Sequence, residues 1–235
     1  MDANDLFREG RLNEAIAALN EALRNDPTDL RSRTFLFELL CFAGDIDRAH
    51  KQLDAISAAD PERHLTAAAY REALRSEEKR REVFKGGELP ETGSSPSALR
   101  GTLNGEPFED ISDADPRVGP RLEVIVGGRY TWMPFQHLVS VTIEPPSNLR
   151  DLFWAPAELK TSAALDHYEG QVLLPAMTAL AWTHADDAVR LGRVTEWEEL
   201  EDGEEAPIGQ KLLFVDDKVF PFLEVRELVI LSPGS

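Results

Sequence analysis

Apolar positions in the first 84 residues recur at three- and four-residue spacing, the pattern of helices that bury one face. Two stretches show this spacing most clearly, one before and one after the Asp26-Pro27 pair. Their apolar positions are Ala15, Ile16, Leu19, Ala22 and Leu23, then Phe35, Leu36, Leu39, Leu40 and Ala43. The pattern predicts a set of amphipathic helices that pack against one another.

Several residues of this region return after 34 positions. They are Gly10 and Gly44, Ala15 and Ala49, Leu19 and Leu53, and the pairs Asp26-Pro27 and Asp60-Pro61. A period of 34 is typical of tetratricopeptide repeats, which are helix–turn–helix units. Glycine suits the turn, and proline ends the second helix because it cannot donate to the helical ladder. Residues 1–84 are therefore predicted to form a tetratricopeptide-like helical domain.

The segment 62–83 follows these two repeats and lacks a turn glycine. It carries the charge run 77–81, Glu-Glu-Lys-Arg-Arg, and we expect a solvated end helix. Stacked repeats usually need about three copies for stability. The rest of the chain is therefore expected to pack against this domain.

A second region of different composition begins after a linker. Residues 85–98 are rich in Gly, Pro and Ser and predict that linker. Residues 99–235 then alternate short β-branched runs with turn signals, and one short helix is expected within 157–169. The runs that predict strands are 100–103, 122–126, 130–133, 138–143, 172–174, 189–194, 212–215, 219–223 and 225–231. The predicted fold class is α+β, with a mostly antiparallel sheet or partly closed barrel after the helices.

The stretch 127–135, GGRYTWMPF, raises a choice between a ligand-binding loop and a hairpin turn. The run EVIV precedes Gly127-Gly128, and RYTW follows it. Two strands joined by Gly-Gly predict a hairpin, because the favoured two-residue turns need positive φ. A phosphate-binding loop would require a helix after the glycines, and no helical pattern follows.

Charge is distributed unevenly along the 235 residues, whose formal net charge is −18. Residues 1–85 hold 17 acidic and 14 basic residues, and residues 86–235 hold 26 and 11. This acidity disfavours nucleic acid and anionic membrane surfaces as partners. The N-terminal segment lacks the apolar core of a secretory signal, and Cys41 is the single cysteine, so a cytoplasmic location is expected.

Candidate chemistry is sparse in the sequence. The five histidines are not paired at metal-ligand spacing, and the segment 184–187, HADD, favours a polar turn. The loop 109–117, EDISDADPR, fails the calcium-loop pattern at its sixth and twelfth positions. No Gly-x-Ser-x-Gly elbow occurs, and Cys41 is expected to be a buried apolar residue. We predict no catalytic, cofactor-binding or metal-binding residue. The acidic run 196–205 is predicted to be a solvated loop or strand edge, and a docking surface for a basic segment is the alternative.

Motifs along almost the whole chain resemble those of the ImpE family, also called the TagJ or SciE family, of type VI secretion accessory proteins. Besides the helical repeats, they are RGTLNG at 100–105, LEV at 122–124, YTWMPF at 130–135, LRDLFW at 149–154, LLPA at 173–176 and LFVDD at 213–217 with Val225-Arg226. The resemblance implies a cytoplasmic, non-catalytic component of a contractile secretion machine. It also implies a protein partner, a helix near the N-terminus of the small sheath subunit, and a link to the ATPase that recycles contracted sheath.

Two hypotheses for function remain open at this point. The first is an adaptor whose helical repeats bind a helix of the sheath subunit in a groove, which modulates sheath assembly or recycling. Its candidate contact residues are Phe7, Arg8, Phe35, Glu38 and Leu39, and the acidic β-rich domain is the rival surface. The second is an enzyme with a carboxylate or metal site in the acidic domain, to which the repeats recruit substrate.

Overall fold

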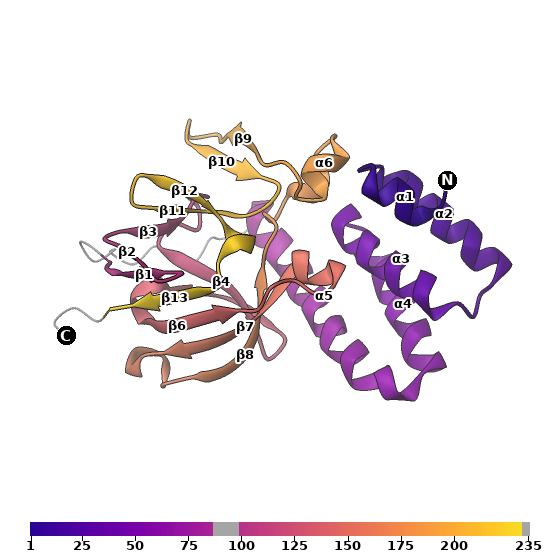
Figure 1. The fold of residues 1–235 in the computed structure, drawn as a ribbon, viewed down its shortest axis with the longest axis horizontal. Coiled ribbons are helices and arrows are strands. Elements are labelled where there is room, and N and C mark those ends of the chain that lie inside the picture. The colour runs from indigo at the N-terminus through magenta and orange to yellow at the C-terminus, as the bar shows by residue number, and fades with distance from the viewer. Residues whose placement is uncertain (87–98, 232–235) are drawn as a thin grey trace.

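Helices α1 to α5 form the N-terminal part of the chain, and a β-rich part follows them (Figure 1). The structure is a computed structural model that describes residues 1–86 and 99–231. The predicted linker therefore lies outside the described residues except for Lys85 and Gly86. The N-terminal helices are α1 (Ala3–Arg8), α2 (Leu12–Asn25), α3 (Leu30–Ala43), α4 (Ile46–Ala59) and α5 (His64–Phe84).

The turn between α3 and α4 shows how the 34-residue repeat is built. Gly44 ends α3 in the left-handed conformation at φ +77°, which favours glycine. Asp45 then caps α4, and its carboxylate accepts a hydrogen bond from the backbone N–H of Arg48. Gly10 adopts the same conformation between α1 and α2, at φ +81°. The predicted helical repeats are confirmed.

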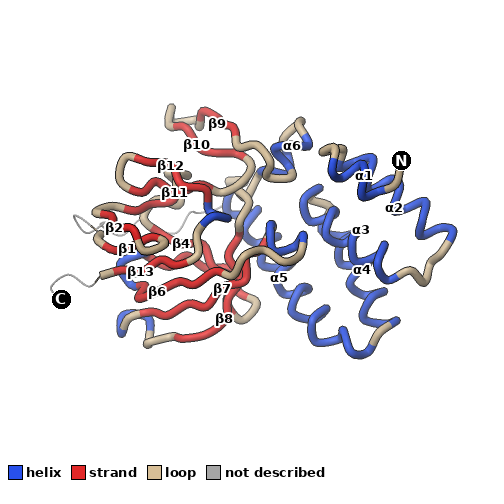
Figure 2. The backbone as a smooth tube through the Cα atoms, in the orientation of Figure 1, coloured by secondary structure: helices blue, strands red, loops and turns tan. Residues whose placement is uncertain are grey.

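Strands after residue 99 pair antiparallel throughout the described part of the chain. The large sheet has the order β2-β1-β13-β6-β7-β8-β4-β5, and the smaller ones are β12-β11-β3 and β10-β9. Figure 2 shows the strands gathered on one side of the molecule and helices α1 to α5 on the other. The predicted α+β fold class is confirmed. The strands are β1 (Gly101–Leu103), β2 (Glu106–Phe108), β3 (Ile111–Asp113), β4 (Arg121–Val126), β5 (Arg129–Pro134), β6 (Leu138–Ile143), β7 (Trp154–Thr161), β8 (Glu169–Pro175), β9 (Glu196–Glu199), β10 (Glu205–Ile208), β11 (Leu212–Val215), β12 (Lys218–Pro221) and β13 (Glu227–Ile230).

The Gly127-Gly128 pair forms the predicted hairpin turn between β4 and β5. Both glycines have positive φ, at +55° and +74°, and Val126 pairs with Arg129 across the turn. Gly128 also approaches helix α5, where its carbonyl accepts a hydrogen bond from the Ser76 hydroxyl at 2.9 Å. The hairpin therefore joins the sheet to the helical domain.

One strand prediction in the β-rich part was wrong, and one predicted helix is very short. Residues 157–169 hold the end of β7, the 3-10 helix Ala163–Leu165 and the start of β8, so the short helix expected there is a single turn. Residues 189–194 are not a strand, because the Asp186 carboxylate caps the short helix α6 (Asp187–Arg190) by accepting from the Ala188 N–H at 2.8 Å.

The charge run 77–81 was also misjudged, because α5 is not a solvated end helix along this stretch. Glu77, Arg80 and Arg81 are buried, with exposed fractions of 1%, 1% and 7%. Only Glu78 and Lys79 of the run face solvent. Helix α5 lies between the repeats and the large sheet (Figure 1), so Arg80 meets Glu123 of β4 while Arg81 donates to the Gly44 carbonyl of the repeats.

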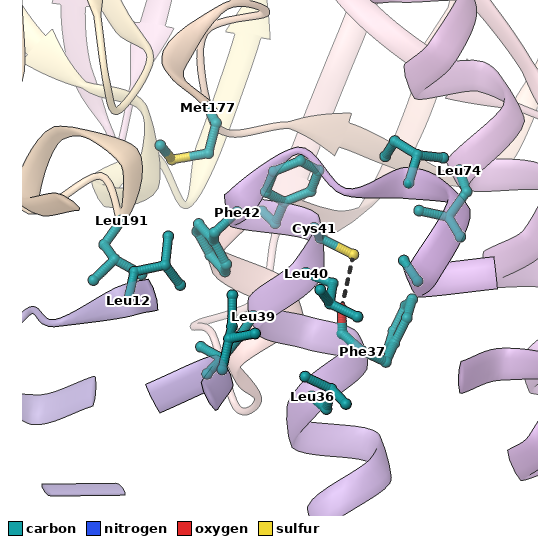
Figure 3. Close-up of a cluster of buried hydrophobic side chains, with 14 of the residues drawn as sticks. Leu12, Leu36, Phe37, Leu39, Leu40, Cys41, Phe42, Leu74, Met177 and Leu191 are labelled. Atoms are coloured by element: carbon teal, nitrogen blue, oxygen red, sulfur yellow. Dashed lines mark hydrogen bonds between the residues drawn. The ribbon is translucent and has the colours of Figure 1, made fainter. Parts of the chain in front are cut away.

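One apolar core extends across both parts of the chain. Figure 3 shows Leu12, Leu39 and Phe42 of the repeats in the same cluster as Met177 and Leu191 of the β-rich part. A second core fills the space between the large sheet and the small sheet β12-β11-β3. The expectation that the repeats pack against the rest of the chain agrees with this shared core.

Candidate protein-interaction surfaces

Helices α1, α3 and α5 each contact the β-rich part of the same chain. The guanidinium of Arg193 donates to the carbonyls of Phe7 and Arg8, at 2.8 Å for Arg8, and lies 5.0 Å from the centre of the Phe7 ring. Further contacts join Glu38 to Arg150, Phe42 to Phe153, Arg190 to the Ala43 carbonyl and Tyr70 to Trp154. This face of the repeats is therefore occupied by the chain itself.

The five candidate contact residues fall into different environments. Leu39 is fully buried in the shared core and offers no surface to a partner. Glu38 is 8% exposed and pairs with Arg150 at 3.4 Å. Burial raises the pKa of its carboxyl above the ordinary value, although the charge of Arg150 opposes this shift. Arg8 is exposed, while Phe7 and Phe35 are half-buried with their rings 5.7 Å apart, edge to face.

Phe35 lies in a groove beside the N-terminus of α1, with a volume of about 610 Å³. We call it the α1 groove. Its apolar lining includes Leu19 and the small side chains of Ala3, Ala18 and Ala22, and its polar lining includes Asp2 and Arg31. The groove follows from helix lengths, since α1 has 6 residues and the neighbouring α2 and α3 have 14 each. The C-terminal half of α2 therefore lacks an α1 neighbour.

A second and larger groove of about 870 Å³ separates α5 from the large sheet. Tyr70 and Ala73 of α5 form one wall, and Ile125, Pro156 and Leu173 of the sheet form the other. The hairpin glycines Gly127 and Gly128 also line this groove. The GGRYTWMPF stretch is thus a turn by conformation, and its glycines also border the open space next to α5.

A cluster of ionised side chains lies between α5 and strand β4. Arg80 donates to Glu123 at 2.8 and 3.0 Å, and Lys211 lies 2.6 Å from Asp113 and also contacts Glu123. All four are at most 4% exposed. Burial opposes the ionisation of Glu123, but the charges of Arg80 and Lys211 outweigh it and hold its pKa below the ordinary value. For Asp113 burial is the larger effect. It raises the pKa of the carboxyl to about 6, although the charge of Lys211 acts in the opposite direction.

The cluster is closed to solvent, and its members satisfy one another. Tyr130 adds a hydrogen bond to Glu123, and Arg80 also donates to the Met177 carbonyl at 2.8 Å. Such an arrangement fixes α5 on the sheet and presents no free charge to a ligand. Within residues 1–86 and 99–231, no grouping of three or more His, Cys, Asp or Glu residues could hold a metal ion.

The sequence contains signals for these buried charges that helix and strand spacing alone does not reveal. Glu123 is a lone acid inside the apolar run LEVIV, and Lys211 is a lone base ahead of LLFV. A charge at an inward position of a strand requires a partner of opposite sign. The burial of Arg80 in the run 77–81 could have been inferred from that requirement. Nothing in the spacing indicated the α1 groove, since Ala18 and Ala22 belong to an ordinary helical face.

Comparisons with known proteins agree with the fold and the motifs. The sequence profile described as "ImpE protein" matches residues 105–229, and a tetratricopeptide repeat profile matches residues 6–75. The chain belongs to the ImpE family. It is 38% identical to the "Type VI secretion system accessory component TagJ" of Pseudomonas aeruginosa over 261 aligned residues, which cover 97% of this chain and 90% of that protein. The resemblance expected from the motifs is confirmed.

A crystal structure has the same fold as this ImpE-family chain. It is that of protein VPA1032 from Vibrio parahaemolyticus, with a TM-score of 0.86 and 22% identity, covering 99% of this chain and 98% of that one. At this identity the likeness concerns the fold alone. None of the helices in the described residues is long and apolar enough to cross a membrane.

Proposed function

We propose that the protein is a non-catalytic, cytoplasmic adaptor of a bacterial type VI secretion system. Its partner is a helical segment near the N-terminus of the small sheath subunit, and binding modulates sheath assembly or recycling by the sheath ATPase. The observation that supports this function is the relationship to a type VI accessory component along 97% of the chain. Tetratricopeptide-like repeats support a role in protein binding.

The α1 groove is the proposed binding site for this helix. At about 1.5 Å per residue, α2 is about 21 Å long and α1 about 9 Å, which leaves about two helical turns of α2 without a neighbour. A partner helix in the groove would continue the direction of α1. The alanine floor of Ala18 and Ala22 allows a close approach of two helices, and the Phe35 ring supplies an apolar wall.

This location revises the set of contact residues. Phe35 stays in the set, and the Phe7 ring packs edge to face against the Phe35 ring. Glu38 and Leu39 leave it because they are buried against the same chain. Arg8 lies at the far end of α1, where its carbonyl accepts from Arg193.

Calorimetric titration with the purified small sheath subunit tests the proposal. Ala22→Arg fills the groove, and we expect it to weaken binding by about tenfold or more. Ala17→Arg is the matched control, since Ala17 is an exposed alanine of the same helix outside the groove. Equal binding by the two variants would reject the site. Unchanged binding after deletion of the subunit's N-terminal helix would reject the partner segment.

A further inference from the structure

Exposed apolar side chains gather on strands β9, β11 and β12. Trp197, Phe214 and Val219 are 40%, 38% and 51% exposed, and Val194, just ahead of β9, is 44% exposed. In the described residues the other large exposed apolar side chains, Met1, Leu65, Val139 and Leu231, come from separate elements. We call the group of Trp197, Phe214 and Val219 the aromatic face.

The three side chains of the aromatic face form one continuous surface. The rings of Trp197 and Phe214 are stacked, with centroids 6.0 Å apart and planes at 19°. Phe214 of β11 is the direct cross-strand partner of Val219 of β12, so these two side chains point to the same side of their sheet. Clustered aromatic surface that stays in water is typical of an interaction site.

Negative charge surrounds this surface. Glu199 lies on the same side of β9 as Trp197 and is the cross-strand partner of Glu205. Like charges placed directly opposite each other are unfavourable, and no Lys or Arg of the described residues forms an ion pair with either. Residues 194–221 contain nine acidic residues and two lysines, one of which is Lys211 of the buried cluster.

We propose that the aromatic face binds a basic segment of a partner protein, in which Lys or Arg residues flank an apolar side chain. The apolar side chain packs on Trp197 and Phe214, and the cations lie against Glu199 and Glu205. An Arg guanidinium also stacks favourably on an indole ring. Nucleic acid and anionic lipid are repelled by the same carboxylates. This surface shares no residue with the α1 groove, so it is a second contact beyond the proposed function.

Fluorescence anisotropy with three labelled peptides tests the specificity of the aromatic face for the full-length protein. The basic probe is Lys-Arg-Phe-Arg-Lys, the second has serine in place of phenylalanine, and the third is Glu-Asp-Phe-Asp-Glu. We expect the basic probe to bind most tightly and its affinity to fall with added salt. Equal binding of all three peptides, or no binding of the basic probe, would overturn the proposal.

Surface variants locate the bound peptide. We expect Trp197→Ser and Phe214→Ser to weaken the basic probe by about tenfold, as truncation of a central aromatic contact does. Val139→Ser is the matched control, because Val139 is 42% exposed on β6. Binding that none of the aromatic-face variants weakens would place the peptide elsewhere and reject the inference. Ala22→Arg in the α1 groove leaves this binding unchanged, so the two sites are tested separately.

Discussion

Arg80 of α5 and Glu123 of β4 form a bidentate ion pair in the interior of the protein. The guanidinium donates to both carboxylate oxygens, at 2.8 and 3.0 Å, and the two side chains are each 1% exposed. Their sequence separation is 43 residues, and the contact joins the helical repeats to the sheet. The relative position of the two parts therefore depends on a charged pair as well as on the shared apolar core.

Removal of Arg80 should destabilise the protein strongly. Arg80→Met leaves Glu123 buried with Lys211 as its only cationic partner in the cluster. Loss of one member of a buried ion pair costs about 3–5 kcal/mol, and the remaining Lys211 places the expected cost near the lower end. Urea denaturation gives the free energy of unfolding. The matched control is Lys79→Met, whose side chain is 68% exposed, and a loss of similar size in both variants would contradict the role of the pair.

Asp113 should make stability depend on pH. Burial raises its pKa to about 6 from 3.8. Between these values the folded protein keeps a proton that the unfolded chain releases, so this contribution to stability falls as the pH rises from about 4 to about 6. The shift corresponds to a change on the order of 3 kcal/mol.

The Asp113→Asn variant isolates that contribution. Glu123 has a lowered pKa and acts in the opposite direction, but it is present in both proteins. We expect the free energy of unfolding of the unmodified protein, minus that of the variant, to decrease between pH 4 and pH 6. Denaturation curves at several pH values measure this difference. A difference that stays constant or increases over the interval would contradict the assignment.

Gly44 should tolerate no side chain. A Cβ at this position would lie 2.5 Å from the Trp182 ring, and the backbone has φ +77°. We expect Gly44→Ala to cost about 2–4 kcal/mol through backbone strain and overpacking. Gly127→Ala shares the positive φ but meets open space, so about 1–2 kcal/mol is expected. Thermal unfolding of both variants measures the contribution of the Trp182 contact, and equal losses would exclude it.

The Cys41 thiol should be unreactive in the folded protein. It is 1% exposed, it contacts the Phe37 carbonyl at 3.3 Å, and burial raises its pKa well above the ordinary value. Figure 3 shows the sulfur among apolar side chains of the shared core. A thiol reagent such as dithionitrobenzoate should label it only as urea unfolds the chain. Rapid labelling without denaturant would contradict a closed core.

Local patterns of the sequence predicted the elements but not how they pack. The turns at Gly10 and Gly44 and the hairpin at Gly127-Gly128 were identified correctly. Each is a local backbone conformation with positive φ, which neighbouring residues in the sequence indicate. The burial of Arg80 depends on Glu123 and Lys211, which are distant in sequence. A polar helical face looks the same whether water or an opposite charge covers it. For that reason the contact between the two parts was expected but its residues were not identified, and Glu38 and Leu39 were kept as candidate partner contacts.

Arg193 should hold α1 in place at its C-terminal end, which is the end away from the α1 groove. Its guanidinium donates to the carbonyls of Phe7 and Arg8 at the C-terminus of α1 and lies over the Phe7 ring. Without these contacts the 6-residue helix is held mainly by buried Leu6 and by the edge-to-face contact of Phe7 with Phe35. We expect Arg193→Ala to speed amide hydrogen exchange in α1 and to leave α4 unchanged. The control Arg24→Ala removes an arginine of α2 whose side chain is 74% exposed, and it should leave amide exchange in α1 unchanged. Unaltered protection of α1 in Arg193→Ala would show that the helix is held by other contacts.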